Sequence, residues 1–530
     1  MVFAIRAMKL SVPPAVTILL AACFFPIASP AAPFDDVGLT ALRAVTTNVD
    51  GTGIRVAQPE ASFPGLGFEV QPLAVPQLPG VLTYASALGS TNVYPNSVGA
   101  NSGHADGVAG IFYGPTDGLA TNVAHVDNYD ADFFITNYVY TLQAMPVASL
   151  VNQSFSYGAL SVGDQQSVDS AFDDYAETFK VLFVSAVDNG GNVHAPGTSY
   201  NCIGVACYYG SASIGPTIDN GRCKPDLTAP NVFTSFATPY VSGAAALLEQ
   251  AALRGDGGSD TNSAFNMRTI KALLLNGAVK PPGWTNGSAT PLDARHGAGF
   301  VNVLNSYKQL AGGKHGSIVS NLVTAGSAHP PTGATGTVSV LSGWNFTTNT
   351  SSTSPARDSI HHYYFNVSNS VASAKFTATA TLVWNRQFNK TGINNLGLFL
   401  YNTANSNLVL CSTSLVDNVE HIYTTNLAQG RYDLQVWKAG GAGIVSAPEP
   451  YALAWEFVPP PVLAISGGAN PALTWPVYPA GFLVEARTNL ISGAWSTNGF
   501  SPPAVTNGLN NILLNPTNGA QFFRLRKPNF

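Results

Sequence analysis

Between residues 45 and 310, short apolar runs alternate with segments of helical pattern. The segments 147–154 and 181–189 hold short apolar runs that stop at polar residues, whereas 167–179 and 242–253 have helical spacing. Strands that are apolar along their whole length are buried on both faces, which predicts a parallel sheet covered by helices. In such α/β sheets, ligands and catalytic groups gather at the carboxyl ends of the strands. The residues that close these runs are therefore the candidates for chemistry.

After Gly312 the residue pattern changes to short alternating segments such as 361–368 and 375–384, which are separated by Asn, Gly, Ser and Pro. This pattern is typical of an all-β sandwich or barrel. Three consecutive prolines at 459–461 form a stiff break, and further short alternating runs follow it. The sequence therefore predicts a signal peptide at 1–31, an α/β domain at 32–312, a β-sandwich at 313–458 and a small β domain at 459–530.

Only 10% of the 530 residues are charged and the net charge is −5, against 45% hydrophobic residues. A nearly neutral chain does not bind nucleic acid by electrostatics, and a chain this rich in apolar groups is not intrinsically disordered. Arg6 and Lys9 precede an apolar stretch that ends in small residues, which predicts export with cleavage after Ala31. Lipid anchoring at Cys23 is the alternative. No later run of 18 apolar residues predicts a transmembrane segment.

Cysteines and aspartates raise two further possibilities. Cys202, Cys207 and Cys223 lie within one segment of 22 residues. Because the chain is predicted to be exported into an oxidising compartment, we expect a disulfide between Cys202 and Cys207 or between Cys207 and Cys223. The closely spaced acids are candidate calcium ligands, although the predicted chemistry requires no cofactor. They are Asp127, Asp130 and Asp132.

Two motifs have the composition of a nucleophile and its base. In residues 224–248, Ser235 stands just before an Ala- and Leu-rich segment, with Thr234 as a predicted helix cap and Pro239 in the predicted first turn. A helix N-terminus stabilises a developing oxyanion. A serine hydroxyl needs a base to remove its proton, and His104, in the Gly- and Ala-rich segment 102–114, is the candidate.

These segments, taken in order, resemble the subtilisin-like serine proteases, the subtilases. The resemblance covers most of residues 45–310. It implies a subtilisin-like parallel sheet, with Ser235 as nucleophile and His104 as general base. It further implies Asn189, at the end of run 181–189, as a donor in the oxyanion hole, and Ser154 on the edge that binds the substrate as an added strand.

The sequence departs from the family at the third triad member and before the nucleophile. Where subtilases have an aspartate at the end of the first strand, segment 55–60 aligns Glu60, which is able to orient an imidazole. Asp106 is the alternative acid. Only three residues separate Pro230 from Thr234, and Phe233 occupies a position that the family gives to glycine. We therefore expect a remodelled primed side of the cleft.

The main hypothesis is a secreted serine endopeptidase with a Glu60, His104 and Ser235 triad, acting on polypeptides. The alternative is an inactive binding or surface scaffold on the same fold. Residues 361–457 are similar to the pre-peptidase C-terminal-like sandwiches of secreted bacterial peptidases. Such a module binds substrate, the cell surface or the catalytic domain, and the sequence does not separate these roles.

Overall fold

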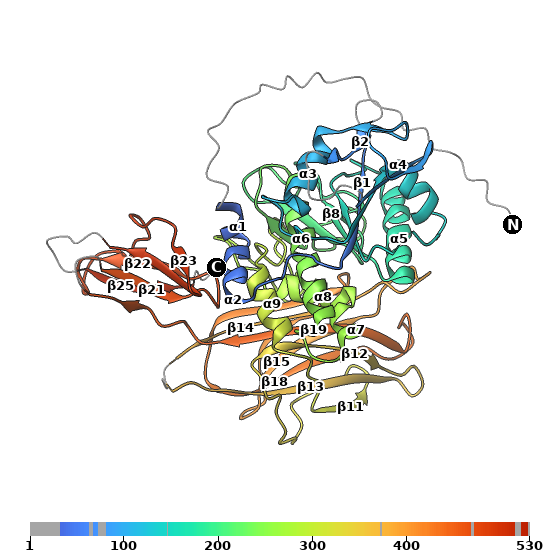
Figure 1. Cartoon of the computed structure of the whole chain (residues 1–530). Coiled ribbons are helices and arrows are strands. Elements are labelled where there is room, and N and C mark those ends of the chain that lie inside the picture. The colour runs from blue at the N-terminus through green and yellow to red at the C-terminus, as the bar shows by residue number, and fades with distance from the viewer. Residues whose placement is uncertain are drawn as a thin grey trace.

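The structure is a computed structural model that describes residues 32–62, 67–72, 81–145, 147–370, 374–467, 471–514 and 521–527. The predicted signal peptide and Cys23 lie outside these residues. The described part divides into an α/β region with the helices of the first 311 residues, a two-sheet β region, and a last group of short strands (Figure 1).

The α/β region is built on an eight-stranded sheet with the strand order β10-β9-β8-β7-β1-β6-β3-β4, parallel except for the β3–β4 pair. This confirms the predicted fold class. Its strands are β1 (Arg55–Glu60), β3 (Leu82–Ser86), β4 (Gly89–Thr91), β6 (His125–Asp130), β7 (Leu150–Gln153), β8 (Leu182–Ala186), β9 (Ile203–Cys207) and β10 (Leu227–Ala229). A separate pair joins β2 (Gly67–Glu69) to β5 (Ala100–Asn101).

Helices cover both faces of this sheet. Figure 1 shows α5 on one side and α3 and α6 on the other. The helices are α1 (Ala32–Asp36), α2 (Leu39–Val45), α3 (Gly103–Tyr113), α4 (Ala131–Phe134), the π-helix η2 (Ile135–Val139), α5 (Val162–Phe179), α6 (Thr234–Arg254), α7 (Thr261–Phe265), α8 (Met267–Asn276) and α9 (Val303–Ala311). Helix α6 is buried along most of its length and ends at Gly255, whose φ of 87° lies in the left-handed region that glycine tolerates.

The β-sandwich consists of two antiparallel sheets. One has the order β11-β13-β18-β15-β16 and the other β12-β19-β14-β17. The strands are β11 (Val319–Thr324), β12 (Ser342–Thr350), β13 (Arg357–Val367), β14 (Phe376–Trp384), β15 (Leu396–Asn402), β16 (Asn407–Ser412), β17 (Val419–Leu427), β18 (Gly430–Lys438) and β19 (Pro448–Val458). Their inward side chains, among them Trp384, Leu434 and Trp455, form one hydrophobic core.

The four-stranded sheet of the sandwich is covered on its other face by the α/β region. Helix α8 contacts β14 and β19, and α9 contacts β12. All nine residues of β14 are buried, and the hydroxyls of Thr379 and Thr381 donate to Asn276 Oδ1 at 2.9 and 3.0 Å. Arg386, just after β14, donates to Asp173 at 3.0 Å and to Asp174 at 2.8 Å on α5. The contacts thus show the sandwich packed on the α/β region.

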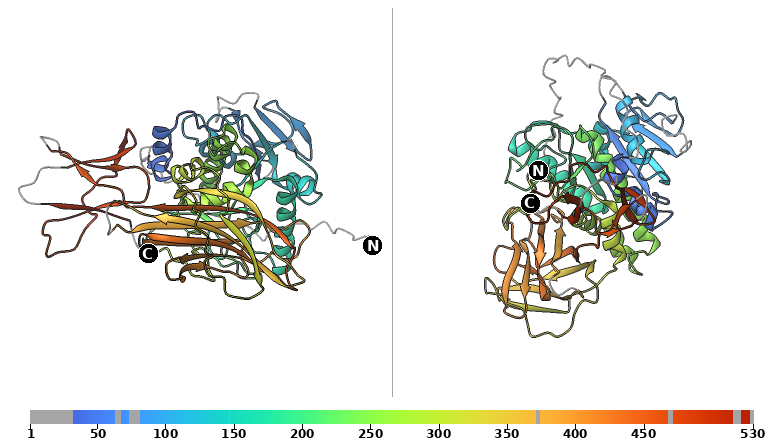
Figure 2. Two further views of the ribbon diagram at one scale, coloured as in Figure 1. Left: turned by 90° about the horizontal axis from the view of Figure 1, so that it is seen from below. Right: turned by 90° about the vertical axis from the view of Figure 1, so that its left-hand side faces the viewer.

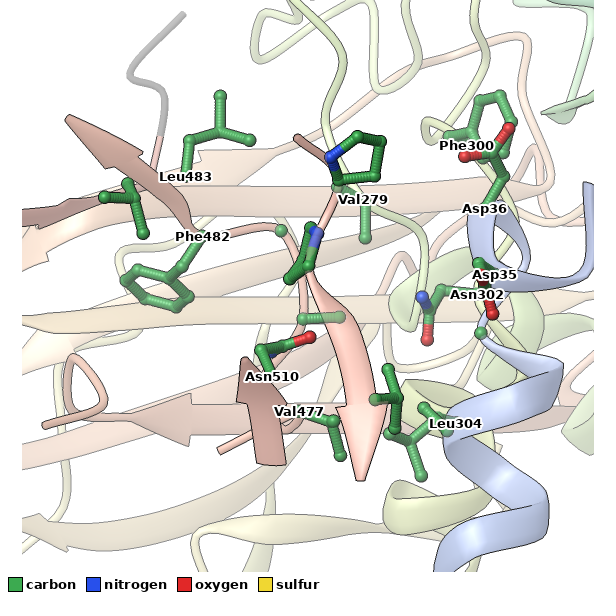
Figure 3. A pocket seen from close by; sticks show the side chains of 18 of the residues that line it. Asp35, Asp36, Val279, Phe300, Asn302, Leu304, Val477, Phe482, Leu483 and Asn510 are labelled. Atoms are coloured by element: carbon green, nitrogen blue, oxygen red, sulfur yellow. The ribbon is translucent and has the colours of Figure 1, made fainter. Parts of the chain in front are cut away.

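The last strands form a smaller group, which Figure 2 shows extending to one side of the molecule. They are β20 (Ala464–Ile465), β21 (Ala472–Pro476), β22 (Leu483–Arg487), β23 (Ala504–Thr506), β24 (Leu509–Leu513) and β25 (Phe522–Arg526). Their core is small, with Leu473, Trp475, Val484 and Ile512 as its buried members. A cavity of about 610 Å³ separates this group from α1 and from the segment after α8 (Figure 3). None of the sequence-predicted site residues lines it.

The disulfide predicted among Cys202, Cys207 and Cys223 is wrong, because all three are free thiols, as is Cys411. Cys202 directly precedes strand β9 and Cys207 is its last residue, and five steps of extended chain span about 16 Å, far beyond the reach of a disulfide. The Cys202 thiol instead donates to backbone carbonyls, and burial raises its pKa to about 12.

Candidate active site

Glu60 and His104 meet at the carboxyl end of the sheet. Glu60 is the last residue of β1 and is 1% exposed, and its Oε2 lies 2.9 Å from His104 Nδ1. A carboxylate oxygen only accepts, so Nδ1 carries the hydrogen of this bond and Nε2 of the neutral imidazole is left as the acceptor. The imidazole itself is 41% exposed. This arrangement gives a base whose accepting nitrogen is free to face a substrate or a hydroxyl.

Helix α3 holds the imidazole in place. His104 is the second residue of the helix, and Ser102 caps the N-terminus by accepting from the Ala105 N–H at 3.2 Å. Burial of His104 lowers its pKa, but the hydrogen bond and the negative charge of Glu60 outweigh burial, so the pKa lies above the ordinary value of 6.5. The pair therefore stabilises the imidazolium that forms when His104 takes a proton.

Asp106, the alternative acid, is engaged elsewhere. Its Oδ1 accepts from the Gln71 N–H at 2.7 Å and its Oδ2 from Asn101 Nδ2 at 2.9 Å. It thus ties β5 and the segment after β2 to the start of α3. Of the two acids that the sequence offered, Glu60 is the one hydrogen-bonded to His104.

Ser235 is the second residue of α6 and is half-buried. The predicted cap is wrong, because Thr234 is already helical, and the residue before it, Phe233, makes no capping hydrogen bond. The cap comes from another strand end: Asn189 Oδ1 accepts from the Thr234 N–H at 2.8 Å and from the Thr234 hydroxyl at 3.1 Å. The Ser235 N–H is one of the free donors at this helix start.

Ser154 supports the backbone of Ser235. The helix begins at Thr234, so Pro239 is its sixth residue and lies beyond the first turn, contrary to the sequence prediction. Without an N–H, Pro239 leaves the Ser235 carbonyl with no helical donor four residues on. The hydroxyl of Ser154, directly after β7, donates to that carbonyl at 2.7 Å. Asn152 donates to Ser154 Oγ at 3.0 Å and accepts from Ser242 on α6 at 2.8 Å.

Asn189 lies in a fixed turn after β8. Because its Oδ1 accepts from Thr234, its exposed Nδ2 is directed away from those contacts. The preceding Asp188 has a φ of 86°, a left-handed conformation, and accepts from the Asn189 N–H at 2.6 Å and from His194 Nδ1 at 2.8 Å. Burial works to raise the pKa of Asp188, but these hydrogen bonds hold it below its ordinary value. Asp188 and His194 were not singled out from the sequence.

His104 and Ser235 lie near the starts of two neighbouring helices, α3 and α6. Helix α3 packs on α6, and the imidazole lies 5.2 Å, centroid to centroid, from the ring of Phe236, the residue after Ser235. In the part of the chain that the structure describes, no hydrogen bond joins His104 to Ser235. Such bonds in free enzymes are often long and tighten when substrate binds.

The loop before Ser235 exposes apolar side chains. Val232 and Phe233 are each about half exposed. Asn231, with a φ of 140°, fixes the loop by accepting from the Val232 N–H at 2.8 Å, and the Tyr209 N–H donates to the Asn231 carbonyl at 2.9 Å. The short loop thus presents an apolar wall next to the candidate nucleophile.

The three candidate calcium ligands do not converge. Asp127 accepts two hydrogen bonds from Arg55, both at 2.7 Å, and Asp130 caps α4 by accepting from the Phe133 N–H at 2.9 Å. Among the described residues no group of three His, Cys, Asp or Glu side chains forms a metal site.

None of the helices in the described part of the chain has the length and hydrophobicity of a membrane-spanning segment.

Residues 89–299 match the model of the subtilase family, Peptidase_S8. Over these residues the chain is similar to the subtilases, which are serine-type peptidases, and this supports a peptidase of the serine type. The match includes His104, Ser154, Asn189 and Ser235 but begins after Glu60, so the acid rests on the geometry alone.

Solved structures of low identity are similar to the chain. The prenylagaramide maturation protease PagA is 20% identical, and the match covers 52% of this chain and 99% of PagA at a TM-score of 0.34. The serine protease of Aeromonas sobria is 14% identical, and the match covers 78% of this chain and 89% of that protease, also at a TM-score of 0.34. The subtilisin-like protease Apa1 from Pseudoalteromonas sp. AS-11 is 12% identical, and the match covers 52% of this chain and 97% of Apa1 at a TM-score of 0.33. No curated protein matches the sequence.

Proposed function

We propose that the protein is a secreted serine endopeptidase that cleaves polypeptides through an acyl-enzyme, with Glu60, His104 and Ser235 as its triad. The observation that carries this proposal is the 2.9 Å bond from His104 to the buried Glu60 carboxylate, in a subtilase-like domain whose Ser235 stands at a helix start. The exposed Nε2 of His104 is the group that accepts the Ser235 proton.

The steps follow from the positions of these groups. Ser235 Oγ attacks the scissile carbonyl while His104 Nε2 takes its proton, and Glu60 stabilises the imidazolium. The oxyanion of the tetrahedral intermediate accepts from Asn189 Nδ2 and from the Ser235 N–H at the positive end of α6. His104 then protonates the leaving amine, and water releases the acyl group from Ser235 by the same route in reverse.

Two supporting roles belong to the same proposal. Ser154 keeps the Ser235 carbonyl paired, and the backbone beside Ser154 is the edge along which an extended substrate adds as a strand. The apolar wall of Val232 and Phe233 borders the site on the side of the shortened loop. No metal or other cofactor takes part in these steps.

Secretion, the domain boundaries at 312 and 458, and binding of cell-surface material by the C-terminal β regions are also proposals. Export rests on the N-terminal sequence pattern. A pull-down on cell-surface polysaccharide and protein with residues 32–530 tests the surface role.

The test of activity is digestion of an unfolded protein by residues 32–530 and by the Ser235→Ala variant. Mass spectrometry of the products distinguishes internal cuts from trimming at the ends. Internal cleavage by the native protein alone supports the proposal. If the folded native protein and the variant both leave the substrate intact, the inactive scaffold is the better description.

A further inference from the structure

The second carboxylate oxygen of Glu60 is held by a buried amide. Gln58 Nε2 donates to Glu60 Oε1 at 2.9 Å and to the Ala105 carbonyl at 3.1 Å, while the Tyr113 hydroxyl donates to Gln58 Oε1 at 2.7 Å. Gln58 and Tyr113 are fully buried. Gln58 precedes Glu60 by two residues, so both side chains lie on the same face of β1.

The contacts allow one orientation of the Gln58 amide. A carbonyl and a carboxylate only accept, so the NH₂ group must face Ala105 and Glu60, and each contact takes one of its two hydrogens. The amide oxygen is left for the Tyr113 hydroxyl. The network therefore has a fixed direction from Tyr113 through Gln58 to Glu60 and on to His104.

A glutamate in this position needs such a restraint. It has one more rotatable bond than an aspartate, so the strand end by itself fixes its carboxylate less well. Here one oxygen is bound by His104 and the other by Gln58, which leaves the carboxylate little freedom to turn. The negative charge of this carboxylate is what stabilises the imidazolium.

We propose that Gln58, fixed by Tyr113 and Ala105, is a positioning residue that makes a glutamate competent as the triad acid. This inference rests on the proposed function for its effect on catalysis, because Gln58 acts through Glu60 and contacts neither substrate nor His104. Its effect on the His104 titration does not depend on activity.

The charges around the network are few. Glu60 on β1 is the charged group that acts on His104. Burial raises the pKa of the Tyr113 hydroxyl well above its ordinary value, and the negative charges of Glu60 and of Asp106 on α3 add to this effect. Tyr113 therefore stays protonated as the donor to Gln58 over the whole working range of pH.

The experiment is an NMR titration of the His104 imidazole in residues 32–530 with Ser235→Ala, which excludes self-cleavage. Gln58→Leu removes the donor to Glu60, so the carboxylate stabilises the imidazolium less and the pKa of His104 falls by about 0.3 pH unit or more. Glu60→Gln gives the largest fall and sets the scale. Tyr113→Phe, which loosens Gln58 without removing it, gives a smaller fall.

The matched control is Gln309→Leu. Gln309 is also a buried glutamine, with Nε2 at 3.5 Å from Glu456 and Oε1 accepting from Asn276 at 2.9 Å, but it lies on α9. The Gln309→Leu variant also loses an amide next to a buried glutamate, and we expect it to leave the pKa of His104 unchanged. If Gln58→Leu does not fold, Gln58→Met, of similar volume, replaces it.

Kinetics with Ser235 restored give the second readout. Gln58→Leu lowers kcat about tenfold while KM changes less than about twofold, because the lost interaction matters mainly in the transition state. The inference is overturned if Gln58→Leu and Gln58→Met lower the melting temperature yet leave the His104 pKa and kcat at the Gln309→Leu values. A protein with the expected titration but no peptidase activity would refute the proposed function and leave Gln58 as the residue that positions Glu60.

Discussion

Two carboxylate–imidazole pairs in this molecule have nearly the same geometry and different surroundings. In the α/β region, Glu60 lies 2.9 Å from His104 Nδ1, and in the sandwich Asp433 lies 2.7 Å from His362 Nδ1. The His104 ring is 41% exposed, whereas the side chains of His362 and Asp433 are fully buried. His362 Nε2 is also bonded, to Asn321 Oδ1 at 2.7 Å.

The difference shows that the acid–imidazole bond does not by itself make a base. Both nitrogens of His362 are occupied, so this ring ties β13 to β11 and β18 as a structural bridge. Within the described residues, His104 keeps one nitrogen without a hydrogen bond beside helix α6, whose second residue is Ser235. No pattern within one segment of the sequence indicates the pair of His362 and Asp433.

The largest expected effect comes from removing each imidazole. His104→Ala lowers kcat/KM by about 10⁴-fold or more at unchanged melting temperature, because the general base is lost. His362→Ala removes the imidazole from the buried Asp433, whose carboxylate keeps the hydrogen bond from Gln435 at 2.8 Å, and this loss costs about 3–5 kcal/mol of unfolding free energy. Thermal unfolding and peptide hydrolysis, measured on both variants, separate the two roles. A folded His362→Ala protein with activity as low as His104→Ala would break the comparison.

Neutralising each acid gives the next effect. Glu60→Gln leaves a group unable to stabilise an imidazolium and lowers kcat by about 10³- to 10⁴-fold. Asp433→Asn keeps the shape of the structural pair and changes kcat by less than about twofold. Steady-state kinetics check both values. Activity of Glu60→Gln within about threefold of native would mean that another group orients His104.

A smaller effect is expected at the oxyanion. Asn189→Ala removes one donor and lowers kcat by about 10²- to 10³-fold, with little change in KM. Because Asn189 also caps α6 through Thr234, the same substitution costs about 1 kcal/mol of stability. Asn189→Asp keeps the cap and lacks the donor, so it separates the two effects. Equal kcat values for Asn189→Asp and the native protein would exclude the oxyanion role.

The smallest effect is a shift in pH dependence. Glu60 holds the pKa of His104 above 6.5, and the neutral form is the base, so kcat/KM should fall as the pH drops through a value above 6.5. Glu60→Gln removes the cause and moves this acid limb to lower pH. If kcat/KM of the native protein falls only well below pH 6.5, the raised pKa of His104 is contradicted.

Residue patterns within one segment carried most of the correct predictions. Segment 55–60 was aligned as the first strand, and β1 spans Arg55–Glu60. Bonds between distant segments were not visible. Gln58 and Tyr113 are 55 residues apart, and Asp433 lies 71 residues from His362, so both pairs depend on packing that no local pattern encodes. The start of α6 was misplaced because its cap, Asn189, comes from another strand end.

Strand β14 shows the same limit for the fold. The alternation of Thr and Ala in segment 375–384 predicts a strand of a β-sandwich, and it does not indicate what covers the Thr face. In the structure that face lies on α8, and the Thr379 and Thr381 hydroxyls bond to Asn276. The sequence alternation was interpreted correctly as a strand, but what covers it depends on a helix about 100 residues earlier in the chain.

Covalent labelling with a fluorophosphonate tests the central claim most directly, because the reagent reacts with a serine only when its hydroxyl is activated. Residues 32–530 are treated, digested and mapped by mass spectrometry, beside Ser235→Ala, Glu60→Gln and His362→Ala. We expect the label on Ser235 alone, no label in Ser235→Ala, labelling slowed by about 10²-fold or more in Glu60→Gln, and native-like labelling in folded His362→Ala. Equal labelling of the native and Ser235→Ala proteins would contradict the account.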